Sequence, residues 1–394
     1  MHDVVIVGAG PAGCHTAALL SKRGFDVHVL EEHPVIGEPV DCSGVVGAEA
    51  LMTLELPGSL QLGEIRTVTL VSPSQLEVRF SLPFPLAYIV DRGAFDRTIA
   101  DQASRSGATF HLGSRVVDLC VQKERVEVEV VNGHASAGKD RKTIMASMVI
   151  LAGGPRYGIQ RKLGMGRPGD LLRTAQTEVA VQGLKEAKIL LGSSVAPSSY
   201  GWIVPFRRRD QEFARIGVSA KTSPIPYLRK LIDHLYDAGC ISSPNVPIRS
   251  WVIPVAPLPR TFADRVLAVG DAAGQTKPTT GGGIYYGLLC AEAAAQSAIA
   301  AFERGDFGLG TLSSYEEAWR KKLGREIRTA AIFRRLAERL NDKDFDDLFR
   351  IAQSNGILSA VTSKARFDWH GEVIRFALTH PGLGRIFLKG LFGQ

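Results

Sequence analysis

Two kinds of apolar pattern divide the chain, and the first is the continuous run of a strand covered on both faces. Such runs occur at 4–7 and 27–30, with a glycine-rich turn and a helical stretch over 14–23 between them. Continuous runs of this length are typical of parallel strands. Further elements expected in this part are a helix ending near 107 and strands at 109–112, 115–121, 126–131 and 144–151. The order predicts a βαβ unit followed by a β-meander.

The second pattern alternates apolar and polar residues, as half-buried strands do. It marks the stretches 65–90 and 176–251, the latter with one helix at 225–239. Both stretches predict strands of a second, antiparallel sheet on the substrate side. Beyond residue 283 the apolar positions recur near helical spacing. Helical segments are expected there at 284–304, 315–340, 346–353, 372–378 and 381–392.

The predicted fold class is therefore α/β, with a Rossmann-like nucleotide-binding domain, an inserted antiparallel β-sheet substrate domain and a helical C-terminal region. A chain of 394 residues, 45% of them hydrophobic, is long enough to bury the cores of about two domains. The nucleotide-binding domain is expected at 1–60, 88–155 and 263–305, the substrate domain at 61–87 and 156–262, and the helical region at 306–394.

The positive charge is concentrated at one end of the chain. Residues 320–394 contain fifteen Lys/Arg and eight Asp/Glu, so the net charge of +7 belongs to this tail. A basic tail suits either a solvated helix face or an anionic partner such as a lipid surface. No nucleic-acid partner is expected, because no recognised binding motif accompanies the charge. The apolar residues that would join a membrane contact are Phe333, Phe376, Ile386, Phe387, Leu391 and Phe392.

Cysteine content and hydropathy exclude further classes. The five cysteines are scattered and lack C-x-x-C spacing, which predicts reduced thiols and no metal site. No leader pattern precedes the first strand, and no window approaches the roughly eighteen apolar residues of a membrane span. We expect a cytoplasmic protein, with any membrane contact peripheral and on the cytoplasmic face.

The turn after the first strand has the spacing of a dinucleotide-binding motif, G-x-G-x-x-G over 8–13. Gly8 would make the turn, Gly10 would let the backbone approach a pyrophosphate, and Gly13 would let helix and strand pack closely. The helix start offers N–H groups and a positive dipole end to phosphate, while Glu31 after the second strand can accept ribose hydroxyls. The nucleotide-binding residues expected here are Gly8, Gly10, Ala12, Gly13, Glu31 and Glu32.

A second motif, Gly270-Asp271 followed by a glycine triplet at 281–283, indicates which nucleotide is bound. An Asp at a strand end suits a ribityl hydroxyl, and the dipole of a glycine-rich helix start would stabilise negative charge on a reduced flavin ring. The pattern resembles FAD enzymes of the p-hydroxybenzoate hydroxylase-like group. This resemblance implies FAD rather than NAD as the cofactor, with contacts from Gly270, Asp271, Gly281, Gly282, Gly283 and Ile284.

Two further segments resemble the geranylgeranyl reductase family. Residues 39–44 match its P-x-x-C-x-G segment, and residues 197–205 match its P-x-x-Y-x-W-x-F-P signature, with Val204 in place of Phe. Alternation along a strand puts Tyr200, Trp202 and Val204 on one face. The resemblance implies that this face lines the substrate pocket beside the flavin.

The same resemblance implies further contacts with FAD, from Cys42, Arg92 and Val116. Structural alternatives are open for several of these residues. Cys42 could be a small apolar filler, Tyr200 and Trp202 could be core packing, and Arg92 could start a surface helix that Asp91 caps.

The resemblance implies an FAD-dependent reductase that saturates C=C bonds of a geranylgeranyl-type polyprenyl chain by hydride transfer from reduced flavin. The catalytic candidates are Tyr200, Trp202 and Cys42, with Tyr200 or water as proton donor. The substrate would be an isoprenoid or prenyl lipid, and an external electron donor such as NAD(P)H or ferredoxin is expected. Because such an alkene is unpolarised, the protein must align it closely with the flavin.

Three alternatives are open. A flavin-dependent monooxygenase shares the fold, but Gly153 replaces the Asp of its Asp-Gly fingerprint. A flavin-dependent halogenase needs a lysine between the first βαβ unit and the later flavin contacts, and none occurs between Lys22 and Lys123. The third alternative belongs to another class, a flavin-binding protein without turnover.

Overall fold

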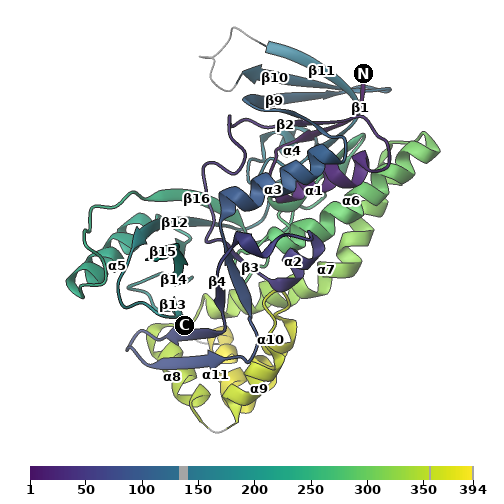
Figure 1. Cartoon of the computed structure of the whole chain (residues 1–394). Coiled ribbons are helices and arrows are strands. Elements are labelled where there is room, and N and C mark those ends of the chain that lie inside the picture. The colour runs from purple at the N-terminus through teal and green to yellow at the C-terminus, as the bar shows by residue number, and fades with distance from the viewer. Residues whose placement is uncertain (133–140, 355, 393–394) are drawn as a thin grey trace.

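The computed structural model describes residues 1–132, 141–354 and 356–392, with side chains up to residue 389. Three β-sheets and eleven α-helices are found within these residues. The first sheet and the N-terminus lie at one end of the molecule, and the C-terminal helices lie at the other (Figure 1).

The first sheet confirms the predicted Rossmann-like core. Its strands follow the order β17-β18-β11-β1-β2-β8, and the five strands from β18 to β8 pair in parallel. Strands β9 and β10 add the expected antiparallel meander beside β11. The bounds are β1 His2–Val7, β2 Val27–Leu30, β8 Thr109–His111, β9 Ser114–Val121, β10 Val126–Asn132, β11 Arg141–Leu151, β17 Phe262–Ala263 and β18 Val266–Ala268.

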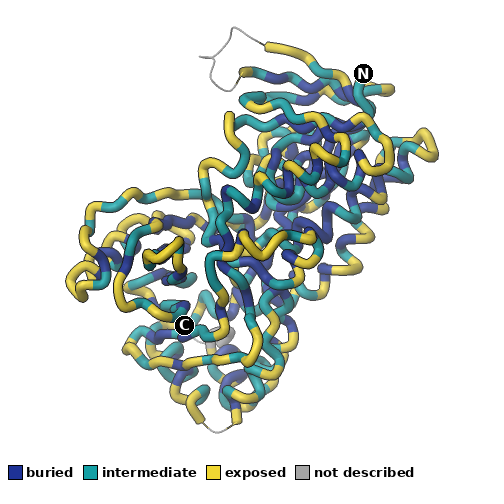
Figure 2. The backbone as a smooth tube through the Cα atoms, in the orientation of Figure 1, coloured by how far each residue is buried: buried dark blue, intermediate teal, exposed yellow. Residues whose placement is uncertain are grey.

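Helices α1 (Pro11–Ser21), α3 (Arg92–Arg105) and α6 (Ile284–Arg304) cover one face of this sheet. Alanines allow α1 and α6 to pack closely, since Ala17, Ala291 and Ala294 are all fully buried. Figure 2 shows buried residues gathered around these helices. The meander and the segment leading into α4 (Gly158–Lys162) cover the other face.

The second sheet has the order β16-β12-β15-β14-β13-β5-β6. It is antiparallel as expected, except that β5 and β13 pair in parallel. Residues 72–186, which include β6 to β12, separate these two strands in the chain, so no hairpin forces them to run in opposite directions. Helix α5 (Ile225–Asp237) covers one face. The bounds are β5 Thr67–Val71, β6 Glu77–Ser81, β12 Leu171–Ala180, β13 Ala187–Leu190, β14 Gly201–Arg208, β15 Gln211–Ala220 and β16 Arg249–Pro254.

A small third sheet, β3-β7-β4, packs against the other face of the second sheet. Its strands are β3 Val45–Val46, β4 Gln61–Ile65 and β7 Ala87–Val90, and α2 (Ala48–Thr53) follows β3. The sequence pattern groups 61–87 with the large sheet, whereas β4 pairs with β7. Alternation identifies the faces of a strand but not its partner, so the pattern could not separate β4 from β5.

The C-terminal helices are α7 Leu309–Ala337, α8 Asp342–Ala352, α9 Ile357–Lys364, α10 Gly371–Thr379 and α11 Pro381–Phe392. Helix α7 begins earlier than the expected residue 315, because burial of Leu312 and Tyr315 outweighs the weak helix propensity of the Gly, Thr and Ser around them. Asn341 and Asp344 form a capping box at the start of α8. Helix α9 was not predicted, since its short sequence has no clear helical period.

A buried ion pair connects this helical region to the loop before α6. The Lys277 Nζ lies 2.8 Å from the Asp368 Oδ1 and donates to the Phe367 carbonyl at 3.0 Å. Both charged side chains are nearly inaccessible, at 3% and 4% exposed. Burial lowers the pKa of Lys277, and Asp368 opposes that shift. The pair therefore fixes the loop that leads into the glycine triplet.

Lys277→Ala should destabilise the protein by about 3–5 kcal/mol, because the Asp368 carboxylate would be buried without its partner. The surface pair of Lys188 and Glu77 gives a matched control, and Lys188→Ala should cost less than about 1 kcal/mol. Denaturant unfolding measures both. The double variant Lys277→Met with Asp368→Asn should recover much of the loss. Equal losses of unfolding free energy in the two single variants would show that the buried pair contributes no more to stability than a surface pair.

Candidate functional site

The turn between β1 and α1 is built by backbone constraints at its glycines. Gly8 has a φ of +100°, and a Cβ there would lie 2.6 Å from the Ala152 carbonyl oxygen. A side chain at Gly13 would overlap the Gly8 carbonyl, whereas a Cβ at Gly10 would meet nothing within 4 Å. Since α1 has no side-chain cap, its first N–H groups face this open space. The turn thus has the shape that a phosphate requires.

Of the two acidic residues after β2, Glu31 is hydrogen-bonded to this turn. The Glu31 carboxylate accepts hydrogen bonds from the Ala9 N–H at 2.8 Å and from the His33 N–H at 2.9 Å. Glu32 instead points to an ion pair with Arg156 at 2.5 Å. Glu31 therefore lies nearer the turn, and the two acids are not equivalent.

Two of the proposed cofactor residues do not form this turn. Ala12 only supports it, and Val116 lies outside it. Ala12 packs beside Gly270, where a Cβ would come within 3.1 Å of the alanine methyl group. Val116 lies in β9 opposite Val130 and packs on the meander side of the first sheet. Ala12 thus brings α1 close to the second motif, while Val116 lies on the opposite face of the sheet.

The second motif brings a carboxylate to the start of α6. Asp271 follows β18, and Gly283 is the residue before α6, where a Cβ would lie 2.7 Å from the Asp271 Oδ1. Each of the other two glycines makes room for a neighbour, Gly281 for Ile253 and Gly282 for Lys277. Ile284 begins the helix and packs at the edge of the main core. Burial raises the pKa of Asp271 to about 6, and Arg92 opposes this shift.

Arg92 is a buried cation between the two flavin motifs. Its Nη2 contacts both Asp96 oxygens at 2.8 Å, and its guanidinium also interacts with the Cys42 thiol. Burial disfavours the charge, yet Asp96 and Cys42 hold the pKa of Arg92 above its ordinary value. Asp91 caps the helix by accepting from the Ala94 N–H, as the structural alternative expected, but the Arg92 side chain is 11% exposed and does not lie at the surface as that alternative required. The Arg92 Nε is buried and has no partner among the described residues.

Tyr200, Trp202 and Val204 lie on one face of the second sheet, as alternation predicts, within the cluster that faces the small sheet. The Trp202 indole N–H donates to the Gln176 Oε1 at 3.1 Å, and the Gln176 amide donates to the Cys42 carbonyl at 3.2 Å. The Tyr200 hydroxyl donates to the Thr280 carbonyl at 2.6 Å, beside the glycine triplet.

These bonds connect the aromatic strand to both flavin-side segments. Burial raises the pKa of Tyr200 to about 12, with Arg334 lowering it and Cys42 raising it further. The phenol therefore keeps its proton at neutral pH. The structure thus brings Cys42, Arg92, Asp271 and Tyr200 around one region, although they come from four separate parts of the chain.

Three residues of this region were missed by sequence reasoning. Gln176 links Trp202 to the Cys42 loop, and Gly217, opposite Trp202, leaves room for the indole ring. The buried Arg215 donates to the Ser43 carbonyl at 2.8 Å and to the Val90 carbonyl at 3.2 Å. A charged residue among apolar strand neighbours was the available signal for Arg215.

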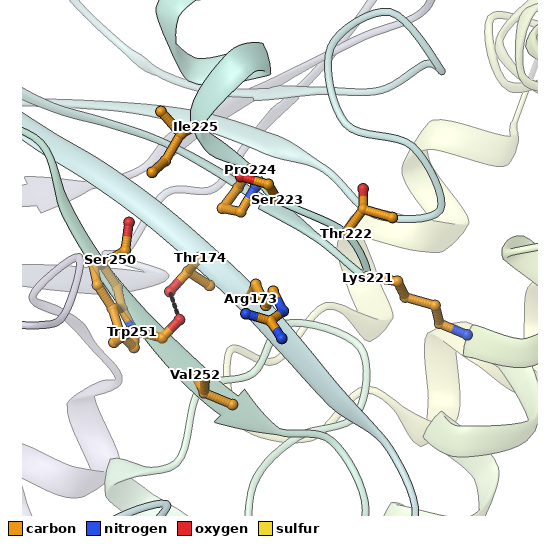
Figure 3. Close-up of a pocket in the computed structure, with 10 residues that line it drawn as sticks. All are labelled: Arg173, Thr174, Lys221, Thr222, Ser223, Pro224, Ile225, Ser250, Trp251 and Val252. Carbon is orange, nitrogen blue, oxygen red and sulfur yellow. Dashed lines mark hydrogen bonds between the residues drawn. The ribbon is translucent and has the colours of Figure 1, made fainter.

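A cavity of about 570 Å³ lies at the edge of the second sheet, near β12, β16 and the start of α5. Ser250 and Trp251 lie at one end of it and Lys221 and Thr222 at the other, with Arg173 between them (Figure 3). Trp251 also packs against the aromatic cluster that contains Trp202. Alternation along β12 puts Arg173 on the face of Ala175, which packs against α5, whereas Gln176 and Trp202 lie on the other face.

The residues present fit FAD. Gly10 leaves open space at a helix start for a pyrophosphate, and the Asp271 carboxylate has no hydrogen-bond partner in the described part of the chain. The unpaired Nε of Arg92 is a further buried donor that a ligand could satisfy. Gly10 would let the backbone approach the pyrophosphate, Asp271 would bind the ribityl chain, and the α6 start would face the ring.

Two family models match parts of the chain. Residues 6–43 match the family described as NAD(P)-binding Rossmann-like domain, and residues 199–354 match the family described as lycopene cyclase protein. Digeranylgeranylglycerophospholipid reductase 2 of Methanothermobacter thermautotrophicus is 30% identical over 370 residues, which cover 91% of this chain and 93% of that protein. Digeranylgeranylglycerophospholipid reductase 1 of Methanococcoides burtonii is 30% identical over 363 residues, covering 88% and 86%.

Solved structures share the fold. A geranylgeranyl bacteriochlorophyll reductase-like protein of Thermoplasma acidophilum superposes with a TM-score of 0.83 at 20% identity, covering 99% of both chains. The flavin-dependent brominase Bmp2 superposes with a TM-score of 0.69 at 18% identity, covering 96% of this chain and 98% of that one. At these identities the likeness concerns the fold alone, so the predicted α/β fold is confirmed.

Asp271→Asn should make the free energy of FAD binding less favourable by about 1–3 kcal/mol, because a neutral amide is a weaker acceptor for the ribityl hydroxyl.

The same variant should stabilise the FAD-free protein. Since the folded pKa is raised above the ordinary 3.8, the ionised carboxylate is unfavourable above a pH of about 6. The gain in melting temperature should therefore shrink as the pH falls through about 6. Flavin titration and thermal unfolding measure the two effects, and unchanged FAD affinity would place Asp271 outside the cofactor site.

Proposed function

We propose that this chain, which belongs to the geranylgeranyl reductase family of FAD-dependent oxidoreductases, saturates C=C bonds in the geranylgeranyl-type chain of a prenyl lipid. The proposal extends to this chain the activity that the names of its relatives describe. The observation that carries it is the hydrogen-bonded path from Trp202 through Gln176 to the Cys42 carbonyl. This path holds an aromatic, apolar face in a fixed position relative to the flavin-side loop.

The chemistry assigns different tasks to cofactor and protein. Bound FAD, once reduced by an external donor such as NAD(P)H or ferredoxin, would supply the hydride. The protein would position one alkene carbon, since an unpolarised double bond reacts only when it is closely aligned. Trp202 and Tyr200, whose ring centroids are 5.9 Å apart, would form the wall against which the flat alkene lies.

The proton must reach the other alkene carbon. The Tyr200 hydroxyl is protonated at neutral pH, but it donates to the Thr280 carbonyl, so its proton is already engaged. We assign Tyr200 either to direct proton transfer or to holding the water that performs it. Cys42 lies near Arg92 and Tyr200 and influences the pKa of both. It would close the same side of the pocket.

The cavity beside Trp251 suits the polar end of such a lipid. Arg173 lies in it without a carboxylate partner among the described residues, and Thr222, Ser223 and Ser250 bring hydroxyl groups. Guanidinium and hydroxyl groups are the usual partners of phosphate oxygens. Trp251, which also packs against the aromatic cluster, would then separate a phosphate-bearing head group bound there from the Trp202 face.

Trp202→Phe should keep FAD but slow the reoxidation of reduced flavin by a geranylgeranyl lipid about ten- to hundredfold, because Gln176 loses its donor and the alkene its alignment. Trp319→Phe is a matched control. It also removes a buried indole N–H, which here donates to the Thr261 hydroxyl directly before β17. Its rate should match that of the wild type.

Anaerobic single-turnover absorbance measures both variants. Equal reoxidation rates for Trp202→Phe and the wild type would show that Trp202 serves only in core packing. Failure of the wild type to reoxidise with any prenyl lipid would favour a flavin-binding protein without turnover.

Contact with a membrane surface is a separate proposal, since a prenyl lipid partitions into bilayers. No helix within the described residues has the length and apolar character to cross a bilayer. Some tail residues expected at the membrane are not available for it, because Phe387 is buried against Phe333, with ring centroids 5.0 Å apart. Leu391 and Phe392 lie outside the residues with described side chains. The exposed Leu388, between Arg385 and Lys389, is the better anchor.

Leu388→Glu should weaken sedimentation with anionic vesicles, because it replaces an apolar anchor of a basic surface by a negative charge. Leu309→Glu is the control, since Leu309 is also exposed but lies at the distant start of α7. Binding of the wild type to anionic vesicles should exceed its binding to neutral vesicles and should weaken as the salt concentration rises. Equal sedimentation of both variants, or none by the wild type at low salt, would remove α11 as a membrane contact.

A further inference from the structure

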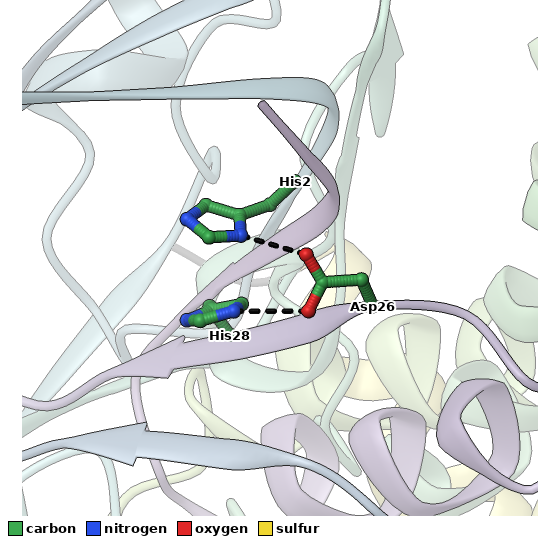
Figure 4. A group of neighbouring side chains, drawn as sticks. All are labelled: His2, Asp26 and His28. Carbon is green, nitrogen blue, oxygen red and sulfur yellow. Dashed lines mark hydrogen bonds and ion pairs between the residues drawn. The ribbon is translucent and has the colours of Figure 1, made fainter.

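Three potential metal ligands meet where the first sheet begins. His2 starts β1, while Asp26 and His28 lie at the entry to β2. The His2 Nδ1 is 2.7 Å from one Asp26 oxygen, and the His28 Nε2 is 3.0 Å from the other. Figure 4 shows both imidazoles directed at the same carboxylate. All three ligand atoms lie within 4.8 Å of one another.

The backbone holds this cluster in place. The Asp26 N–H donates to the Asp3 carboxylate at 2.9 Å, and the Asp26 carbonyl accepts from the Val4 N–H at 3.1 Å. Asp26 is therefore fixed to β1 on both sides of its Cα. Ligands carried by paired strands need little reordering when an ion binds.

His28 also has the outer partner that metal-binding histidines normally have. Its Nδ1 lies 2.7 Å from the Nε2 of His111, in the adjacent strand β8. If the His28 Nδ1 carries the proton and donates to His111, the His28 Nε2 presents its lone pair toward Asp26. A ligating imidazole typically donates its other N–H to such an acceptor, which fixes both its tautomer and its ring orientation.

We propose that His2, Asp26 and His28 form a binding site for a divalent transition-metal ion of the Zn²⁺ type, with His111 orienting His28. Two imidazoles and one carboxylate are the ligand set that such ions take when water completes the coordination. Ligand atoms around a tetrahedral zinc stand about 3.3–3.5 Å apart, given bond lengths near 2.0–2.1 Å. The half-exposed side chains of His2 and Asp26 can make this small adjustment. Each imidazole keeps one N–H, so only the tautomer changes.

The site is separate from the flavin chemistry. It lies at the amino ends of β1 and β2, whereas the phosphate turn follows the carboxyl end of β1. A bound ion would cross-link the first two strands of the nucleotide-binding sheet. The cysteine pattern could not reveal this site, because it contains no cysteine.

Calorimetric titration of the chelator-treated, FAD-loaded full chain with Zn²⁺ tests the proposal. The wild type should bind one ion per chain with saturation, and Zn²⁺ should raise its melting temperature. His2→Gln and Asp26→Asn should abolish both effects while keeping the FAD content, since these side chains are at the surface. His234→Gln, which changes an exposed histidine on α5, should bind as the wild type does.

His111→Asn should lower the affinity about tenfold, because the outer partner of His28 is weakened. Absence of saturable binding by the wild type would overturn the proposal. Binding that persists in both His2→Gln and Asp26→Asn would also overturn it, by placing the ion elsewhere.

Discussion

The buried guanidinium of Arg215 is the interaction on which the arrangement of the proposed site depends. It is 2% exposed, its Nε donates to the Glu178 carboxylate, and its Nη1 donates to the carbonyls of Ser43 and Val90. Removing a partner from a buried charge is strongly destabilising, so these carbonyls cannot move away without a large cost. Gly44 has no side chain and leaves the space that the guanidinium fills. The Cys42 loop is thereby fixed to the second sheet.

This restraint explains how two sheets would contribute to one proposed site. The flavin motifs belong to the first sheet and its helices, while the aromatic face belongs to the second. Arg215 and Gln176 connect the Cys42 loop to the second sheet, and the Lys277–Asp368 pair connects the loop before α6 to the C-terminal helices. Each connection is a buried polar contact with defined geometry, rather than apolar packing that could slide. Alignment of an unpolarised substrate requires this kind of rigidity.

The sequence predicted those features whose constraints are local. The turn over 8–13 could be predicted because its glycines are required by backbone geometry, and the face shared by Tyr200 and Trp202 followed from alternation along one strand. The partners of Gln176, Arg215 and Lys277 could not be predicted, because they lie far away in sequence. The same limitation explains why the tail was assigned more exposed apolar residues than it has, since the packing of Phe387 on Phe333 depends on how α11 folds back onto α7.

Gly217 has a consequence for how this protein could diverge. The indole of Trp202 occupies the volume that a side chain at position 217 would need, so the two strand positions share one space. Substitutions at either position therefore depend on the residue at the other, and their effects on stability should not be additive. A change in the shape of the proposed alkene wall is accessible mainly through paired substitutions, in which a smaller ring at 202 precedes a larger residue at 217. The residues at positions 202 and 217 would then be expected to change together.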